Sequence, residues 1–175
     1  MTDPIQEQPL VWANRADYND AKSGHTRVAA HQITLTSLAD GAARQGSKAS
    51  FGEDMYNKYA VRVGIEFDVA PTAGEAVYVY WSASIDGTPA TGNDGGCTGA
   101  DAAYKAGDEE EWVNQLTLIG VLTVTADAAA TVQYATIGSL EPPTRYGQIV
   151  VWNKSGEALE GDSVEMFVAL IPDLV

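Results

Sequence analysis

The alternation of apolar and polar residues is most regular between Tyr59 and Val69. Apolar side chains occupy every second position there, and small or charged residues lie between them. A period of two predicts a β-strand with one buried face and one wet face. Pro71 and Gly74 then supply a turn, after which Ala76–Ser82 resumes the same alternation. We therefore expect these two strands to pair as an antiparallel hairpin at the centre of the core.

Weaker alternation, interrupted by Gly, Pro and Asn, predicts further strands along the chain. Asp40–Gly46 is expected to be a loop, and Asp101–Lys105 a single helical turn. Many short strands with almost no helix indicate an all-β fold, which we expect to be a single antiparallel β-sandwich of jelly-roll-like form. One of the further strands, 116–125, is apolar on both faces near its middle, which suggests burial on both sides. These strands are expected at Ala30–Leu38, Ser47–Phe51, Leu116–Thr125, Thr131–Ile137, Gln148–Asn153 and Ser163–Ile171.

The length of 175 residues suits one domain with a well-filled core. Residues 1–28 show no sustained period, so we expect an extended N-terminal arm followed by a β-sandwich domain at 29–175. Leu10, Val11 and Trp12 would anchor this arm, because a tryptophan side chain is costly to leave in water. The alternative is a frayed terminus. No signal peptide is expected, because the first ten residues contain no basic region.

Acidic residues dominate the charge, and the formal net charge is −14. Residues 1–62 contain seven acidic and seven basic side chains, whereas residues 63–175 contain 17 acidic and three basic ones. A negative surface repels phosphate, so no nucleic acid partner is expected. The apolar runs are too short to span a bilayer, so no membrane partner is expected either. The acidic body either orients the molecule on a partner or simply keeps the surface solvated.

Residues suited to catalysis are scarce in this sequence. The spacing of His25 and His31 does not bring them together, and no Walker, G-x-S-x-G or H-E-x-x-H motif occurs. Cys97 is the single cysteine, which excludes an internal disulfide, and we expect its thiol to be buried or half-buried and unreactive. The acidic run Asp108–Glu111 lacks the alternating ligand spacing of a calcium loop. We therefore expect no enzyme activity, no cofactor and no metal site.

Three further features are candidates for contact with a partner. Tyr78 and Tyr80 fall on the wet face of the second hairpin strand, where they either contact a partner or a sugar or face a second sheet. The glycine-rich segment Gly87–Gly99 is a long loop, and long loops often carry function. The third feature is the acidic run. With the arm, these features give the candidate interface residues Leu10, Val11, Trp12, Tyr78, Tyr80, Asn93, Asp94, Glu109 and Glu110.

A series of short segments between His31 and Ile171 resembles a group of small structural proteins of tailed bacteriophages and prophages. The resemblance implies a non-enzymatic virion component, and it assigns no functional residue. Capsid decoration proteins of phages are often β-sandwiches, many of jelly-roll type, that sit as oligomers on the outer capsid surface. In order, the segments are Thr34–Leu38, Ala42–Gly46, Tyr59–Arg62, Ala70–Gly74, Val79–Trp81, Gly92–Tyr104, Arg145–Gly147 and Ser163–Met166.

Our expectation from the sequence is a capsid decoration (cement) protein on the outer surface of the virion. It would bind the major capsid protein as a homo-oligomer, either a dimer or a trimer. A tail or head–tail protein of the same fold is the alternative within phages. A carbohydrate-binding module is the alternative from another class, with either the glycine-rich loop or Tyr78, Tyr80 and Trp81 as its binding residues.

Overall fold

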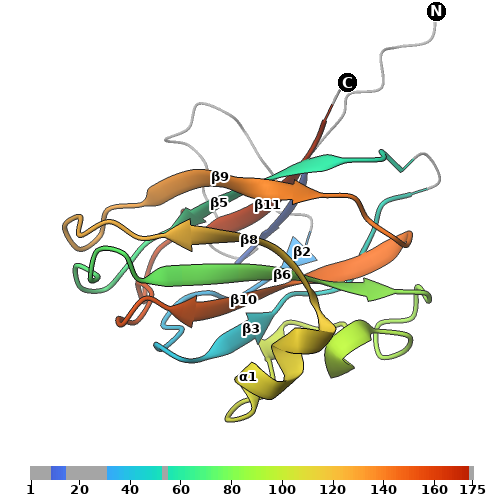
Figure 1. Cartoon of the computed structure of the whole chain (residues 1–175), viewed down its shortest axis with the longest axis horizontal. Coiled ribbons are helices and arrows are strands. Elements are labelled where there is room, and N and C mark those ends of the chain that lie inside the picture. The colour runs from blue at the N-terminus through green and yellow to red at the C-terminus, as the bar shows by residue number, and fades with distance from the viewer. Residues whose placement is uncertain (1–8, 15–30, 53–54, 174–175) are drawn as a thin grey trace, which may run out of the picture.

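The computed structural model describes residues 9–14, 31–52 and 55–173, and this part of the chain is mainly β-strand (Figure 1). The expected all-β fold is confirmed. Helix is limited there to short turns, namely α1 (Glu109–Trp112), η2 (Asp94–Gly96) and η3 (Val113–Gln115). The strands are β1 (Leu10–Ala13), β2 (His31–Gln32), β3 (Ala43–Gln45), β4 (Ala49–Ser50), β5 (Tyr59–Ile65), β6 (Ala76–Ser84), β7 (Ala102–Ala103), β8 (Thr117–Thr123), β9 (Gln133–Leu140), β10 (Tyr146–Lys154) and β11 (Phe167–Pro172).

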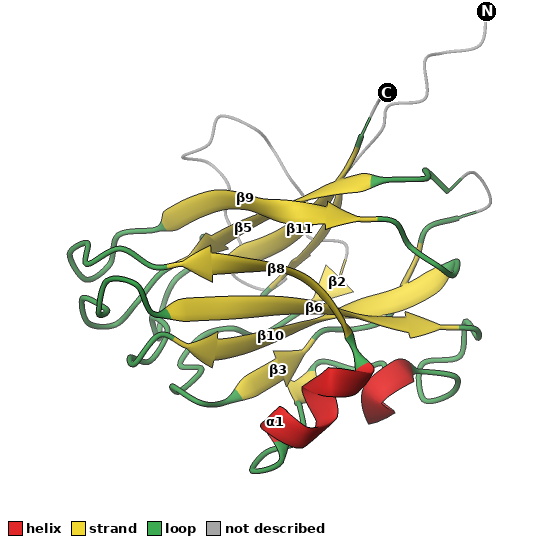
Figure 2. Ribbon diagram, viewed as in Figure 1, coloured by secondary structure: helices red, strands yellow, loops and turns green. Residues whose placement is uncertain are grey.

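The described strands form one continuous sheet in the order β2-β1-β11-β5-β9-β8-β6-β10-β3-β7, and β4 pairs with β10. Neighbouring strands run antiparallel, except for the parallel pair β1 and β2. The sheet curls, so that inward side chains from both of its halves meet in one core (Figure 2). The two layers expected of a sandwich are therefore two halves of a single curled sheet. The jelly-roll form stays a prediction.

The main core lies inside the curl and takes side chains from alternate positions of most strands. Trp12 and Trp81 are both 0% exposed and meet edge to face, with ring centroids 6.1 Å apart. The alternation that begins at Tyr59 is confirmed within β5, because Val61 and Val63 are buried while Arg62 between them is exposed. Its predicted continuation to Val69 is wrong, since β5 ends at Ile65 and Val69 is 52% exposed. Each buried aliphatic side chain of this kind contributes roughly 1.5–3 kcal/mol.

The predicted hairpin between β5 and β6 is wrong. Strand β5 pairs with β11 and β9, whereas β6 pairs with β8 and β10. The connection at 66–75 is too long for a tight hairpin turn, and it is tied elsewhere, since Phe67 is buried and bridges to Leu159. Strands β9 and β8 lie between β5 and β6 in the sheet. Local alternation predicted both strands but carried no information about which strands they pair with.

Strands β8 and β9 meet at a single residue pair, Gly120 and Gly138. In each strand the preceding isoleucine, Ile119 or Ile137, is an extra residue in the ladder with the neighbouring strand. Such bulges bend a strand and increase its twist. A Cβ on either glycine would overlap the carbonyl oxygen of the isoleucine in the other strand. The two Ile-Gly steps therefore let the strands cross closely where the sheet curls.

The two ends of the sheet approach each other and are tied by hydrogen bonds. The Ser47 N–H donates to the Gln32 carbonyl oxygen (2.7 Å), and the Gln32 N–H donates to the Ser47 hydroxyl (2.9 Å). The Asp101 carboxylate accepts hydrogen bonds from the N–H (3.0 Å) and hydroxyl (2.6 Å) of Thr34 and from Arg44 Nε (2.6 Å). Thr34 follows β2 and Arg44 lies in β3, so this carboxylate joins the two ends. We call Asp101, Thr34 and Arg44 the Asp101 clasp.

Other local predictions were wrong as well. Asp101–Lys105 contains β7 instead of a helical turn, and Asp40–Gly46 contains β3. These two short strands pair with each other, with Arg44 opposite Ala103 and Gln45 opposite Ala102, and β7 forms the edge of the sheet. Strand β8 is buried on one side only, since Leu118 is 51% exposed. Of the expected strand Ala30–Leu38, only β2 has strand geometry in the described residues.

Candidate partner interface

Strand β1 carries three of the candidate interface residues and pairs with β11 along its whole length. Val11 is 1% exposed and Trp12 is 0% exposed, whereas Leu10 is half-buried. The indole N–H of Trp12 also donates to the Ser47 carbonyl oxygen at 2.8 Å. Val11 and Trp12 therefore anchor β1 within this chain, and their prediction as partner contacts is wrong. Apart from residues 9–14, the predicted arm at 1–28 lies outside the described residues.

The outer face of β6, β10 and β3 is covered by residues 92–116, which we call the cap. A second, smaller core lies beneath the cap. Tyr80 belongs to this core and is 8% exposed, so its prediction as an open interface residue is wrong. Tyr78 is half-buried at the edge and stacks on Tyr80, with ring centroids 6.5 Å apart. The second core consists of Ala43, Tyr80, Cys97, Tyr104, Val113, Val150 and Trp152, with Tyr78, Trp112 and Leu116 packed against it.

Hydrogen bonds hold the glycine-rich part of the cap in place. Gly95 has a φ of 61° and no room for a Cβ, because the Leu116 side chain and the Tyr104 hydroxyl pack against it. That hydroxyl donates to the Gly95 carbonyl oxygen at 2.8 Å. The side-chain amide of Asn93 donates to two carbonyl oxygens of the loop at 2.8 and 2.9 Å. Asn93 therefore braces the loop from within, whereas Asp94 is exposed.

Lys48 orders the loop that leads from β6 into the cap. Its ammonium group lies within 2.6–2.8 Å of four oxygen atoms of the chain. Hydrogen bonds from a charged donor are stronger than neutral ones, so a single side chain can tie several turns of this loop together. The four acceptors are the Ser84 hydroxyl and the carbonyl oxygens of Asp86, Thr88 and Thr91.

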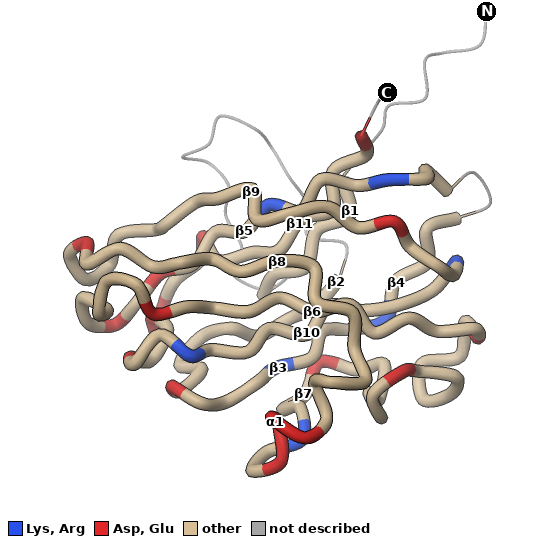
Figure 3. The backbone as a smooth tube through the Cα atoms, viewed as in Figure 1, with Lys and Arg blue, Asp and Glu red and all other residues tan. Residues whose placement is uncertain are grey.

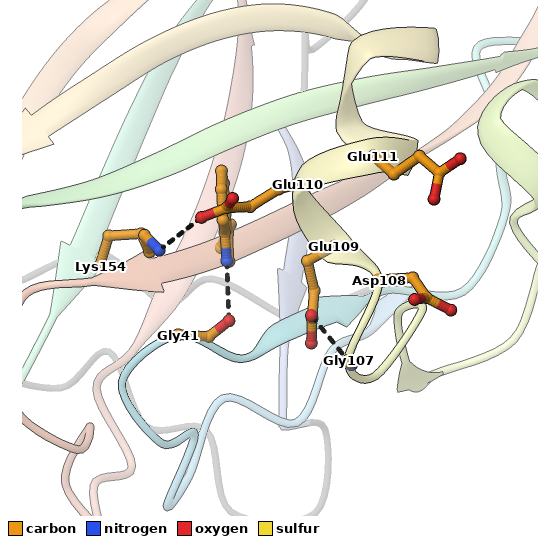
Figure 4. Close-up of a pocket in the computed structure, with 8 residues that line it drawn as sticks. Gly41, Gly107, Asp108, Glu109, Glu110, Glu111 and Lys154 are labelled. Carbon is orange, nitrogen blue, oxygen red and sulfur yellow. Dashed lines mark hydrogen bonds and ion pairs between the residues drawn. The ribbon is translucent and has the colours of Figure 1, made fainter.

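The acidic run forms α1, which stands at the rim of an open pocket of about 350 Å³ (Figure 4). Glu110 Oε1 lies 3.1 Å from Lys154 Nζ, and this Nζ lies 4.7 Å from the centre of the Trp152 ring. Figure 4 shows Glu110 turned towards Lys154, with Asp108 and Glu111 on the other side of the helical turn. The pocket is lined by Gly41, Gly107, Asp108, Glu109, Glu110, Glu111, Trp152 and Lys154.

A second open pocket, of about 360 Å³, shares Lys154 with the first. Its lining includes the half-buried Tyr78 and the carboxylates of Asp40 and Glu75. The structure therefore brings the sequence-predicted Tyr78 to the same surface as Glu109 and Glu110. Both pockets combine carboxylates with an aromatic side chain, which is a chemistry suited to a cationic group of a partner.

The three basic residues of the segment 63–175 all lie against aromatic rings. Lys105 Nζ is 3.8 Å from the centre of the Trp112 ring, and the guanidinium carbon of Arg145 is 5.7 Å from that of Tyr146. Lys154 lies over Trp152, as described above. Cation–π contacts hold these cations close to the protein. Carboxylates lie along α1 and at many loops (Figure 3), so the surface there is negative.

The cap contains the single cysteine of the sequence, Cys97, and its thiol is buried. Burial raises the pKa of the Cys97 thiol, so the group stays protonated at neutral pH and is a poor nucleophile. The prediction that this thiol is buried is confirmed. Among the described residues, no group of three or more His, Cys, Asp or Glu side chains is placed to hold a metal ion. In the same residues, no helix has the length and apolar character needed to cross a membrane.

The sequence did not reveal the residues that organise this surface. Lys48 and Asp101 act through partners far along the chain, so no local pattern marks them. The contact between Trp152 and Lys154 could have been predicted from the sequence, because residues two apart on a strand lie on the same side of the sheet. Comparison with protein-family models and with curated protein sequences gave no match.

Proposed function

We propose that this protein is a non-enzymatic structural protein of a tailed-phage virion. In its most specific form, the proposal is that the protein decorates the capsid and binds the outer surface of the major capsid protein shell. The observation that carries the proposal is the cap, an acidic layer held on the outside of the sheet by its own small core. A surface that is already ordered loses little conformational entropy on binding. The resemblance of residues 31–171 to phage structural proteins supports the same role.

The proposed mechanism is mechanical. Asp94, Glu109 and Glu110 on the cap would pair with basic side chains of neighbouring capsid subunits. Contacts that spread over two subunits oppose their separation, because each bound copy adds interface free energy that the bare shell lacks. Complementary charge would also speed the encounter with the shell and orient the cap towards it.

Fractionated particles test the location. Mass spectrometry of purified heads and tails is expected to find this protein in heads at high copy number. Particles that lack the protein should release DNA at a lower temperature than complete particles. Recovery in tails alone would favour the tail or head–tail alternative. Equal DNA release from both kinds of particle would contradict the stabilising mechanism.

Charge reversal on the cap tests the binding surface. The double variant Glu109→Lys, Glu110→Lys is expected to lose about tenfold or more in affinity for shells stripped of the protein, equivalent to about 1.4 kcal/mol. The matched control is Asp162→Lys, which reverses an exposed charge outside the cap. Co-sedimentation with stripped shells measures both. Unchanged binding by the double variant would show that the cap does not face the shell.

Two of the three aromatic residues named for the carbohydrate-binding alternative are buried in the structure, while Tyr78 is half-buried. Trp81 is 0% exposed and lies in the main core, and Tyr80 is covered by the cap. Neither ring can stack on a sugar without opening the fold. Nothing about the glycine-rich loop favours a glycan, since Asn93 is engaged with the loop's own carbonyl oxygens.

A further inference from the structure

The outward side of β8 and β9 differs from the rest of the molecule in its charge. Between Val113 and Leu140 the sequence contains a single charged residue, Asp127. Asp127 lies in the loop that joins the two strands and not on either strand. Figure 3 shows no acidic or basic position along β8 or β9. In a chain with a formal net charge of −14, this face is an uncharged area.

Apolar side chains are exposed on this face. Leu118 is 51% exposed and Tyr134 is 44% exposed. Directly opposite residues of antiparallel strands point to the same side, and Leu118 lies opposite Tyr80, which is on the outer side of the sheet. We call the outward side chains of the two strands, together with the crossing glycines, the β8–β9 face. It consists of Leu118, Gly120, Val121, Thr123, Tyr134, Thr136 and Gly138.

A charged residue does border the β8–β9 face, and its charge is positive. Arg62 of β5 lies opposite Thr136, and its guanidinium carbon is 5.9 Å from the centre of the Tyr134 ring. Within the described part of the chain, the carboxylates lie on other surfaces, among them α1 and the loops (Figure 3). The cost of bringing two negative molecules together is therefore lowest when they meet through this face.

We propose that the β8–β9 face is the surface through which two copies of this chain associate. A twofold contact places the same patch of each copy against the other, so an acidic patch would repel itself and an uncharged one does not. Leu118 and Tyr134 supply the apolar area, and the threonines around them can hydrogen-bond across the contact. Two strands of seven and eight residues with their flanks offer on the order of 500 Å² per copy, typical of a reversible dimer.

Sedimentation velocity of the full chain over a range of concentrations tests this proposal. The wild type is expected to rise from the monomer mass of 18.5 kDa towards twice that value. Leu118→Lys should remain a monomer at the same concentrations. Thr136→Lys alters no core side chain and should also remain a monomer. It provides the test if Leu118→Lys folds poorly. The matched control is Ile85→Lys, which adds the same charge at an 84% exposed side chain outside this face and should dimerise like the wild type.

Salt provides a second readout. A contact free of charges between two acidic bodies should strengthen when salt screens their repulsion, whereas a contact built on ion pairs should weaken. A wild type that stays monomeric at all concentrations would overturn the proposal. So would dimers that survive both lysine substitutions, or dimers that dissociate as salt is added. The outcome is independent of the capsid proposal, because a monomer can still bind shells through its cap.

Discussion

The Asp101 carboxylate joins the two ends of the sheet through its hydrogen bonds with Thr34 and Arg44. Burial acts to raise its pKa, but hydrogen bonds from Arg44 and Thr34 outweigh this, and the pKa is held below the usual value of 3.8. The folded state therefore favours the charged form. The resulting stabilisation is fully present above the unfolded-state pKa and is lost as the pH falls through the lower folded-state pKa.

We expect Asp101→Asn to lower the free energy of unfolding by about 1.5–3 kcal/mol at neutral pH, the usual contribution of hydrogen bonds to a charged group. The difference between variant and wild type should shrink as the pH falls from 3.8 through the lower folded-state pKa, because the folded wild-type carboxylate becomes protonated only below that folded-state pKa. Urea unfolding at several pH values measures it. The exposed Asp162→Asn is the control and should unfold like the wild type. A difference that stays constant down to low pH would contradict the role of the charge.

Lys48 is a second residue whose role is set by distant partners. Lys48→Met keeps most of the apolar stem and removes the ammonium group from its four acceptors. We expect faster amide hydrogen exchange and faster proteolysis at 85–92, while the main core keeps its protection. The control is Lys58→Met, because the Lys58 side chain is 43% exposed and its Nζ lies 3.9 Å from Asp173 Oδ2, a weak surface pair. Unchanged exchange in the loop would show that the ammonium does not order it.

At the scale of elements, the curl of the sheet rests on the two Ile-Gly steps in β8 and β9. We expect Gly120→Ala to lower the free energy of unfolding by about 1–3 kcal/mol, because its Cβ would overlap the Ile137 carbonyl oxygen and force the strands apart. Gly161→Ala is the matched control, since the nearest atom to its Cβ is the Ser37 hydroxyl oxygen at 3.2 Å. Thermal unfolding compares the two variants. Similar midpoints would mean that the crossing tolerates a wider spacing.

The same elements show where sequence reasoning stops. Period-two alternation located β5 and β6, because burial on one face leaves its mark at every second residue. Turn residues between apolar segments located β8, β9 and β10, and β10 shows no such alternation because it is buried on both faces from Gly147 to Asn153. Alternation failed for the pairing of β5 with β6, since pairing depends on the whole topology and not on neighbouring positions. The bulges at Ile119 and Ile137 could not be predicted from the sequence either, because a bulge is defined by the pairing of one strand with another.

At the scale of the whole molecule, the sequence predicted the position of acidic regions better than it predicted which residues are exposed. The acidic run and the glycine-rich loop were singled out separately in the sequence, and the structure brings them together in the cap. Trp12 was predicted to anchor the arm because a tryptophan is costly to leave in water, and Tyr80 was predicted to lie on the wet face of its strand. Both are buried in cores of this chain. The β8–β9 face was missed in the sequence because it is recognised by a lack of charged residues. That lack becomes apparent only when β8 and β9 are seen side by side.

The pairing of β1 with β11 has a consequence for the order of events during synthesis. Trp12 lies at the centre of the main core, but the strand that carries it forms its full ladder with β11, which is translated more than 150 residues later. A ribosome adding about 5–20 residues per second makes that interval about 10–30 s. Throughout this time the backbone of β1 lacks this partner, although Ser47 and Trp81, which contact the Trp12 ring, are translated much earlier. The nascent chain thus presents the backbone edge of β1 long before β11 can cover it, which makes this strand a natural contact for a chaperone.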